Sequence, residues 1–344
     1  MKLIYFLAFI VSCIFSLILT PLFRHMSLKK GFIDKPNKRK VHRKEIPSLG
    51  GLAIFASFLL AVVLFIKITN FIISPKIIGL FIGCVVLIGM GIYDDLKDMP
   101  AVIKLGGQVL VASIVYFCGF RIEEFFGFEA NTVFLEISSF LVTIFWIVGI
   151  INAINLLDGL DGLACGICCI VALFLFMISI ANQNYWLLIF TSILAGSCLG
   201  FLPYNFHPAS IFMGDTGSMF LGFILSLLAI ESYQKSTTFI AVLVPMIAMA
   251  VPIIDTSLSI LRRLLSKKPL FTADKNHIHH RLLVNDKSHV RVVLTLYTVT
   301  FFFGLISLGL KDIKGIYMIA ALIMVNLVTF RWIKNSGFLD AGRN

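Results

Sequence analysis

Long apolar runs separated by short polar intervals form the main pattern of this chain. Most runs are close to the roughly 20 residues that a helix needs to cross the hydrocarbon core of a bilayer. Ser218–Glu231 is shorter, and we expect it to be tilted or partly buried. The pattern predicts eleven spans, which are Leu3–Leu22, Gly51–Ile66, Ile77–Ile92, Val102–Gly119, Val133–Ile151, Leu163–Ile180, Tyr185–Leu202, Ser218–Glu231, Phe239–Leu261, Val292–Leu310 and Gly315–Phe330.

The composition supports a membrane protein and excludes an ordinary soluble one. Hydrophobic residues make up 59% of the chain and charged residues 14%, against about 45–50% and about 25% in soluble domains. Leu3–Leu22 is interpreted as an uncleaved first span, because the run is too long for a signal peptide and no small-x-small site follows it. The prediction is a single all-α, polytopic integral membrane domain over residues 1–344.

Lysine and arginine are unevenly distributed between the two sets of loops. With the N-terminus outside, 21 of the 29 basic residues fall in cytoplasmic segments, as the positive-inside rule requires. We therefore expect the N-terminus outside and the C-terminus in the cytoplasm. The net charge of +11 reflects topology and anionic lipid, or attraction of an anionic substrate, and both interpretations stay open. Nucleic acid is not an expected partner, because no folded basic domain is predicted.

Four polar segments far apart in the sequence fall on the cytoplasmic side. They are the end of the third span with Asp94 and Asp95, the stretch Asn152–Gly162, the MGDTGS segment around Asp215, and the HIHH sequence of the last inner loop. The spans hold almost no acidic residues at mid-depth, where ion-coupled transporters place theirs. The pattern favours chemistry at the cytoplasmic membrane surface. The expected site segments are 24–49, 94–101, 152–162, 203–217 and 262–291.

Each acidic segment has a chemical and a structural interpretation. Asp94 and Asp95 close a helix at its C-terminus, where the macrodipole disfavours negative charge. A divalent cation, a cationic side chain or protonation of one acid would stabilise them, while a solvated helix end near Lys97 is the alternative. Asp215 begins a helix in a segment rich in glycine and hydroxyl groups. That setting suits phosphate and Mg²⁺ binding as well as ordinary capping.

Asn155, Asp158 and Asp161 recur at every third position, so they would share one face if the segment were helical. Oxygen ligands on one face suit Mg²⁺ or sugar hydroxyl groups. A plain turn containing Gly159 and Gly162 is the alternative.

Histidine and lysine side chains add candidates for phosphate contact. On a helix, His277 and His280 would share one face, and the spacing favours phosphate or sugar contact over zinc, with a solvated loop as the alternative. Lys104, near the inner end of the fourth span, could reach a phosphate or simply snorkel. Three further histidines are isolated in the sequence and are interpreted as structural or solvated: His25, His207 and His289. Together the segments predict Mg²⁺-dependent phosphoryl chemistry between a soluble anionic substrate and a lipid-borne one.

Five motifs resemble, in order, those of the polyprenyl-phosphate N-acetylhexosamine-1-phosphate transferases of glycosyltransferase family 4. They are KRKVHRKEIPSLGG, GIYDDLKD, INAINLLDGLDGL, FLPYNFHPASIFMGDTGS and DKNHIHHRLL. The HIHH and RKVH sequences resemble the undecaprenyl-phosphate N-acetylglucosaminyl-1-phosphate transferase branch. The muramoyl-pentapeptide branch has three consecutive histidines and a TPTMGG-like loop, where this chain has IPSLGG.

The resemblance implies transfer of an N-acetylhexosamine-1-phosphate from a UDP-sugar to undecaprenyl phosphate, with release of UMP. It further implies Mg²⁺, with Mn²⁺ as an alternative, and a bacterial cytoplasmic membrane with the site facing the cytoplasm. The product would start a cell-surface polysaccharide such as O-antigen or teichoic acid. N-acetylglucosamine is the default sugar, and a homodimer is left open. A transporter of a phosphorylated lipid or sugar is the alternative function, and a scaffold without turnover is disfavoured because no expected acid is replaced.

The family's site residues carry over onto matching positions of this chain. Asp94 or Asp95 would deprotonate or orient the lipid phosphate, and Asp215 would hold Mg²⁺, with Asn155 as a second ligand. The implied substrate contacts are Lys40, His42, Lys104, Asp158, Asp161, Asn205, His277, His279 and His280.

Overall fold

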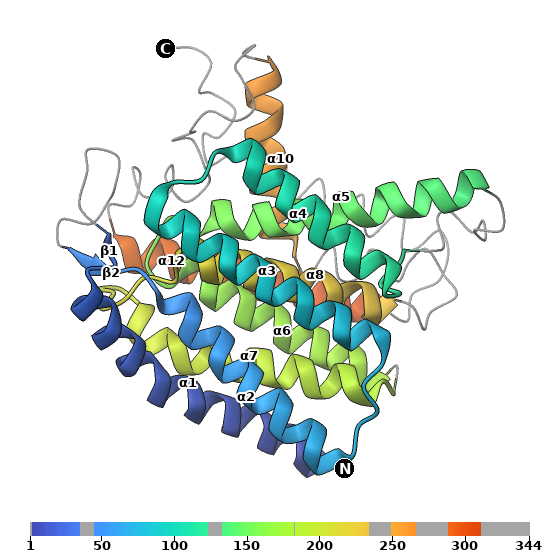
Figure 1. The fold of residues 1–344 in the computed structure, drawn as a ribbon, viewed down its shortest axis with the longest axis horizontal. Helices are drawn as coiled ribbons and strands as arrows, with labels where there is room; N and C mark the ends of the chain where they lie inside the picture. Colours follow the sequence, from blue (N-terminus) through green and yellow to red (C-terminus); the bar gives the residue numbers. More distant parts are fainter. Residues whose placement is uncertain are drawn as a thin grey trace.

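The computed structural model describes residues 2–34, 45–122, 133–181, 183–233, 249–265 and 288–310, and this part of the chain is almost entirely helical (Figure 1). Two short strands, β1 (Ile33–Asp34) and β2 (Ile46–Pro47), lie between the first two helices. The described helices are α1 (Lys2–Lys30), α2 (Gly50–Thr69), α3 (Pro75–Lys97), α4 (Ala101–Phe117), α5 (Val133–Leu157), α6 (Leu163–Ala181), α7 (Tyr185–Asn205), α8 (Gly214–Tyr233), α10 (Ala250–Leu265) and α12 (His289–Leu310).

Ten of the eleven expected spans overlap a described helix. Eight of the described helices are long and apolar enough to cross a membrane, and α4 is a shorter apolar helix. The expected span Phe239–Leu261 is described only from residue 249, and Gly315–Phe330 lies outside the described residues. The chain is a polytopic helical membrane protein.

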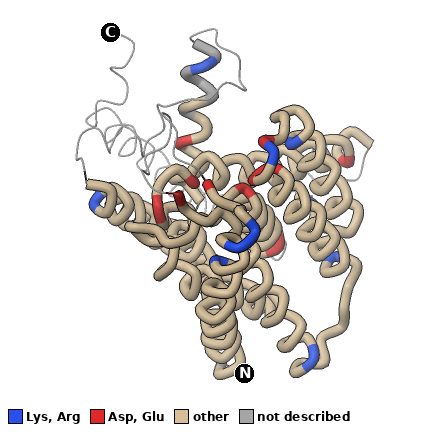
Figure 2. Tube along the Cα trace, turned by 60° about the vertical axis from the view of Figure 1, so that its left-hand side comes forward, with Lys and Arg blue, Asp and Glu red and all other residues tan. Residues whose placement is uncertain are grey.

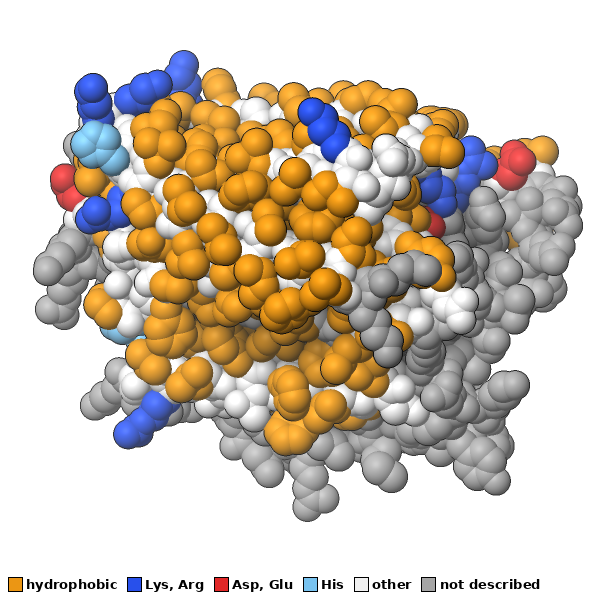
Figure 3. All heavy atoms as spheres, turned by 90° about the horizontal axis from the view of Figure 1, so that it is seen from below, with side chains coloured by type: hydrophobic (Ala, Val, Ile, Leu, Met, Phe, Trp, Pro, Cys, Tyr) orange, Lys and Arg blue, Asp and Glu red, His pale blue; other side chains and the backbone are white. Residues whose placement is uncertain are grey.

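The surface has the character that a bilayer requires. Large apolar side chains such as Ile72, Val102 and Phe145 are strongly exposed. On the face seen in Figure 3, hydrophobic side chains cover most of the described part, and Lys and Arg lie mainly near its edges. Lipid tails rather than water suit a surface of this kind.

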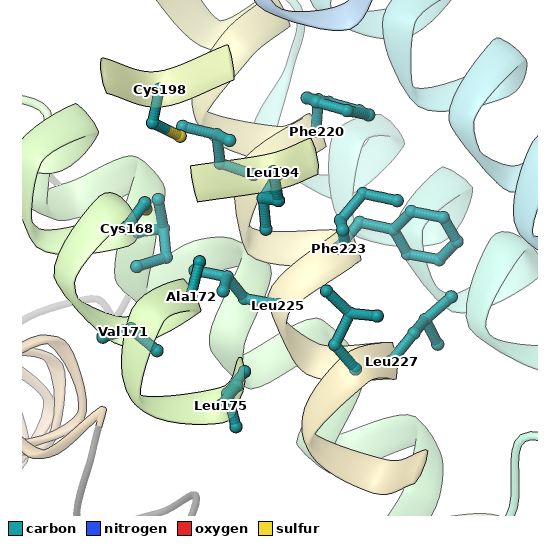
Figure 4. Close-up of a cluster of buried hydrophobic side chains, with 14 of the residues drawn as sticks. Cys168, Val171, Ala172, Leu175, Leu194, Cys198, Phe220, Phe223, Leu225 and Leu227 are labelled. Atoms are coloured by element: carbon teal, nitrogen blue, oxygen red, sulfur yellow. The ribbon is translucent and has the colours of Figure 1, made fainter. Parts of the chain in front are cut away.

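Helix α8 forms the centre of the described bundle and packs against α2, α3, α5, α6 and α7. Its segment Ser218–Glu231 was expected to be tilted or partly buried, and it is almost wholly enclosed by other helices. A helix without a lipid-facing side can carry small and hydroxyl-bearing residues that pack closely. Figure 4 shows Leu225 of α8 pointing toward Ala172 of α6, while Phe220 and Phe223 point to the other side of α8, where they meet Phe58 of α2 and Gly83 of α3.

Helix α3 runs antiparallel to α8, and polar contacts connect the two helices at both ends. At one end, Lys76 Nζ lies 2.9 Å from Glu231 Oε2, and Asn184 Nδ2 donates to Glu231 Oε1. At the other end, the carboxylate of Asp95 meets the first residues of α8. Between them, Gly83 faces the ring of Phe223 at close range.

The segment Arg24–Leu49 is more ordered than a plain polar loop in its described parts. Helix α1 continues through Lys30, beyond the expected span end at Leu22. The strands then pair antiparallel, with Ile33 opposite Pro47. This small pairing is an exception to the all-α prediction, and alternation over so short a stretch gives no strand signal in the sequence.

The IPSLGG sequence packs against the segment before α8. The backbone N–H groups of Gly50 and Gly51 donate to the carbonyls of Phe212 and Met213, both at 2.8 Å. A Cβ on Gly51 would lie 2.1 Å from the backbone nitrogen of Gly217. Glycine is therefore required there, because the backbones of α2 and α8 touch directly.

Candidate active site

Asp95 caps the N-terminus of α8 from a different helix. Its Oδ1 accepts the backbone N–H of Asp215 at 2.8 Å, and its Oδ2 accepts the N–H and hydroxyl of Thr216 at 3.1 and 2.6 Å. The sequence placed this acid at a helix C-terminus, where the macrodipole is unfavourable. The N-terminal end of α8 offsets that, because its free N–H groups attract a carboxylate.

Lys104 joins the two other carboxylates of the cluster. From α4, its ammonium donates to Asp94 Oδ2 at 2.6 Å and also to Asp215 Oδ2. The Lys104 and Asp94 side chains are only 13% and 10% exposed, whereas Asp215 is 34% exposed. Asp94 also accepts the N–H of Met99 at 2.6 Å. Asp215 is therefore the member of the cluster that is most open to a ligand.

Helix α5 supplies amide groups to the same cluster. Asn155 Nδ2 donates to Asp215 Oδ1 at 2.7 Å and to Ser218 Oγ at 2.8 Å. One helical turn earlier, Asn152 Nδ2 donates to Gln108 Oε1 at 2.6 Å, and Gln108 is fully buried. Asn152 and Gln108 thus fix the packing of α4 on α5, which carry Lys104 and Asn155.

The helix α5 ends at Leu157, inside the stretch Asn152–Gly162. The idea that Asn155, Asp158 and Asp161 share one helical face is therefore wrong. Gly162 has a φ of +78°, a conformation that favours glycine, and the chain turns between α5 and α6. Asn155 contacts Asp215, while Asp161 contacts the loop after α7.

Asp158 lies in this turn, between Asn155, which contacts Asp215, and Asp161, which contacts the loop after α7. Burial raises the pKa of the Asp158 carboxyl well above its usual range, and the negative charges of Asp215, Asp95 and Asp161 raise it further. The neutral carboxyl can donate a hydrogen bond, which an ionised carboxylate cannot.

Two cavities meet at Asp94. The larger, of about 1060 Å³, is lined by the acids Asp94, Asp95, Asp158, Asp161 and Asp215, with further lining from Arg24, Asn205, His207, Phe212 and His289. The smaller, of about 300 Å³, is lined by Asp94, Met99, Ala101, Lys104, Leu105, Asn152 and Asn155. The larger cavity has the volume of a small-molecule site. Figure 2 shows many of the acidic residues in the upper part of the described chain.

A second polar cluster lines the larger cavity. Asp161 Oδ2 lies 2.8 Å from His207 Nδ1 and accepts the N–H of Ala209 at 3.1 Å. The ring of His207 stacks on that of His289, with centroids 4.3 Å apart. The hydroxyl of Tyr297, two turns along α12, donates to the carbonyl of Gly162.

The donor set around Asp215 fits a Mg²⁺ ion. One ammonium, that of Lys104, is shared by Asp94 and Asp215, and Asp95 and Asp158 lie close enough to repel negative charge. The cluster therefore carries more negative than positive charge when its acids are ionised. Carboxylate oxygens such as those of Asp215 are ligands that Mg²⁺ prefers, whereas Asn155 presents its amide nitrogen to Asp215.

Most of the expected site residues in the described part of the chain come together at this cavity. Asp94, Asp95, Asp158, Asp161, Asn205 and Asp215 line the larger cavity, and Lys104 and Asn155 line the smaller one. Five expected substrate contacts lie outside the described residues: Lys40, His42, His277, His279 and His280.

The sequence analysis missed several residues of this region. His207 and His289, interpreted as isolated, stack on each other although 81 residues separate them. No local pattern could have paired them. Thr216 and Ser218 had a usable signal, because both belong to the MGDTGS motif. Arg24 belongs to the expected site segment 24–49 but was not singled out there; it lines the cavity and donates to the carbonyl of Ser210.

The fold and site define a class: a polytopic helical membrane protein with a carboxylate cluster where several helices end. The family described as glycosyl transferase family 4 matches residues 77–233, which include Asp94, Lys104, Asn155 and Asp215. The chain belongs to glycosyl transferase family 4, and the resemblance drawn from its motifs is confirmed.

Relatives match most of the chain. It is 39% identical to a Bacillus subtilis protein named "Probable undecaprenyl-phosphate N-acetylglucosaminyl 1-phosphate transferase", over 89% of this chain and 84% of that protein. It is 34% identical to a Mycobacterium tuberculosis protein named "Decaprenyl-phosphate N-acetylglucosaminephosphotransferase", over 83% and 76%. A Caldicellulosiruptor bescii protein named "Phospho-N-acetylmuramoyl-pentapeptide-transferase" is 32% identical, over 90% and 98%.

Proposed function

We propose that this protein transfers N-acetylglucosamine-1-phosphate from UDP-N-acetylglucosamine to undecaprenyl phosphate. The observation that carries the proposal is the Lys104 ammonium shared between Asp94 and Asp215, two carboxylates that line a cavity of about 1060 Å³. Phosphoryl transfer needs little covalent chemistry from the protein, and it depends on positioning and on neutralising phosphate charge. The names of the Bacillus and Mycobacterium relatives support the same reaction.

In the proposed reaction, an oxygen of undecaprenyl phosphate attacks the phosphorus that carries the sugar. A new P–O–P linkage forms, the original linkage to UMP breaks, and UMP leaves with the bonding electron pair. Asp94 accepts or orients the proton of the lipid phosphate, and Lys104 faces the charge that develops between the two phosphates. Asp95 fixes the start of α8 and thereby the position of Asp215.

Asp215 would hold Mg²⁺, and Asn155 would be the second ligand once its amide turns so that Oδ1, in place of Nδ2, faces the ion. When bound, the ion would neutralise the diphosphate oxygens and the departing UMP.

Two further residues are suited to contact the donor. Asn205 is 2% exposed, and its Oδ1 has no hydrogen-bond partner among the described residues, while its Nδ2 donates to Ile211 O at 3.1 Å. A substrate N–H or O–H would satisfy that oxygen. The raised pKa of Asp158 favours the protonated carboxyl, which can donate to a substrate oxygen. Lys40, His42, His277, His279 and His280 are proposed as contacts from the sequence motifs alone.

We further propose eleven spans with the N-terminus outside and the C-terminus and the site in the cytoplasm of a bacterium. The uneven distribution of Lys and Arg supports this orientation. The product would begin a cell-surface polysaccharide.

Release of UMP tests the proposed reaction. We expect protein purified in nanodiscs to release UMP from UDP-N-acetylglucosamine only when undecaprenyl phosphate and Mg²⁺ are both present. UDP-N-acetylgalactosamine, a UDP-6-deoxy-N-acetylhexosamine and UDP-N-acetylmuramoyl-pentapeptide, each assayed separately, would identify the sugar. If none of these donors gives lipid-dependent UMP, the protein is not this transferase.

The substitution Asp215→Asn tests the assigned metal ligand. We expect at least a hundredfold loss of turnover, because the amide cannot neutralise Mg²⁺ and removes charge from the cluster. Size-exclusion elution and a melting profile like those of the unmodified protein would show that the variant is folded, so that the loss of turnover is not caused by unfolding. Turnover close to that of the unmodified protein would remove Asp215 as the ligand.

A further inference from the structure

We propose that Asp161, His207 and His289 form a binding site for a transition-metal ion such as Zn²⁺, separate from the Mg²⁺ position at Asp215. The three side chains each offer one ligand atom, and these atoms lie within 4.8 Å of one another. They come from the turn before α6, the loop after α7 and the first residue of α12. All three line the larger cavity, so an ion can reach them.

The chemistry of the donors favours a transition metal over Mg²⁺. Imidazole nitrogens are ligands for Zn²⁺, Co²⁺ and Ni²⁺, while Mg²⁺ prefers oxygen ligands only. Two histidines with one carboxylate leave a fourth tetrahedral position. Because the cluster lines the cavity, that position can be filled by water or by a substrate oxygen.

A small rearrangement would close the site around an ion. With metal–ligand distances of about 2.0–2.1 Å, tetrahedral ligands lie roughly 3.3 Å apart. The imidazole rings of His207 and His289 are nearly parallel, at 15°, so one ring must turn before both nitrogens point at the same ion. His207 is exposed and at the surface of the cavity, which makes it the ring that can turn.

Two features of His289 and Asp161 are typical of residues that bind a metal ion. The buried Nε2 of His289 has no hydrogen-bond partner among the described residues. A buried polar atom without a partner is costly, and a metal ion would satisfy it. Asp161 is held by the N–H of Ala209 at 3.1 Å, the kind of outer contact that orients metal ligands. Tyr297 holds α12 against the carbonyl of Gly162, beside Asp161.

A bound ion would connect α12 to the turn between α5 and α6. His289 lies nine positions after His280, the last histidine of the HIHH sequence. The ion would therefore fix the point at which that segment enters α12. Its predicted role is to hold the wall of the cavity in place, and it takes no part in bond breaking.

Cobalt absorption tests the site. Tag-free protein in nanodiscs, freed of metal with a chelator and kept in excess Mg²⁺, is titrated with Co²⁺. We expect one equivalent to give the visible absorption of tetrahedral cobalt, and Zn²⁺ to remove it by competition. Absorption should be lost in His207→Gln and in His289→Gln. It should persist in the control His25→Gln and in a triple variant of His277, His279 and His280.

Two outcomes would overturn the proposal. One is that Co²⁺ gives no tetrahedral absorption with the unmodified protein. The other is that absorption survives in His207→Gln, or is lost in the triple variant while His207 and His289 are intact. His207 is exposed, so His207→Gln tests the site even if His289→Gln does not fold. The readout is independent of UMP release, so this proposal and the proposed reaction can fail separately.

Discussion

Asp94 and Asp95 are adjacent in the chain but face different partners. Asp94 shares the Lys104 ammonium with Asp215 beside both cavities. Asp95 accepts three hydrogen bonds from Asp215 and Thr216 at the start of α8. The pair therefore combines one acid that is placed to meet substrate with one that positions the neighbouring helix.

Substitution by asparagine should separate these two functions. Asp95→Asn replaces an accepting oxygen with a donor that faces other donors, so we expect a loss of about 1–3 kcal/mol in stability together with reduced turnover. Asp94→Asn should reduce turnover strongly and lower the melting temperature less than Asp95→Asn, because an amide oxygen can still accept from Met99 and Lys104 keeps its contact with Asp215. Thermal melts and UMP release on both variants provide the check. Equal melting temperatures for the two variants would contradict the capping function of Asp95.

Asp158 should make stability depend on pH. Its pKa is raised in the folded protein, against about 3.9 in an unfolded chain. The folded state therefore binds more protons between these two values, so stability falls as pH rises through that window. We expect Asp158→Asn to flatten the fall in melting temperature measured without Mg²⁺. An unchanged pH profile would show that Asp158 does not titrate in this window.

The acids could be predicted from the sequence because their motifs are local. Their partners could not, because the contacts join distant positions: Asp95 with Thr216, Lys104 with Asp215, and Asp161 with His207. The three-residue repeat of polar residues also failed to predict that α5 ends at Leu157 and that the chain turns before α6.

At the scale of elements, the close approach of the α3 and α8 backbones depends on Gly91. A Cβ on Gly91 would lie 2.4 Å from Thr216 Cα, a backbone atom that cannot swing away. The two backbones therefore meet one turn before Asp94 and Asp95. This close approach is what brings Asp95 within reach of the N–H groups of α8.

Gly91→Ala should therefore disturb the site without touching an acid. We expect α8 to shift away from α3, which weakens the Asp95 cap and lowers turnover at least tenfold. The matched control is Gly89→Ala on the same helix, since a Cβ there meets no atom within 4 Å. UMP release and melting temperature are measured on Gly91→Ala and Gly89→Ala to test whether the site depends on the close contact at Gly91. Equal activity in the two variants would contradict this dependence.

Most helices could be predicted from hydrophobic runs because lipid imposes a simple length rule. The exceptions are informative. Helix α1 continues to Lys30, past its apolar run, and α8 begins at Gly214, before its own. Neighbouring segments surround the first residues of α8, whereas most residues in the last two turns of α1 are exposed.

At the scale of the whole molecule, the Lys76–Glu231 pair connects helices far from the carboxylate cluster. Glu231 is 7% exposed, and Asn184 also donates to it. Lys76→Met leaves a buried carboxylate without this cation, so we expect a loss of about 1–3 kcal/mol, the cost of a buried acceptor that loses its partner. The double variant Lys76→Met with Glu231→Gln should recover part of it. Thermal unfolding in detergent gives the comparison, and an unchanged melting temperature in Lys76→Met would show that the pair is not stabilising.

The polar contacts at the two ends of the α3–α8 pair are separated by a distance that can be compared with the thickness of a bilayer. At 1.5 Å per residue, Lys76 and Asp95 are separated along α3 by about 28 Å, close to the roughly 30 Å of a bilayer's hydrocarbon core. Polar contacts at both ends prevent the two helices from sliding past each other. A bilayer thinner or thicker than this distance creates hydrophobic mismatch, which helices relieve by tilting. The pair would then tilt as one unit, and the carboxylate cluster would keep its internal geometry in membranes of different thickness.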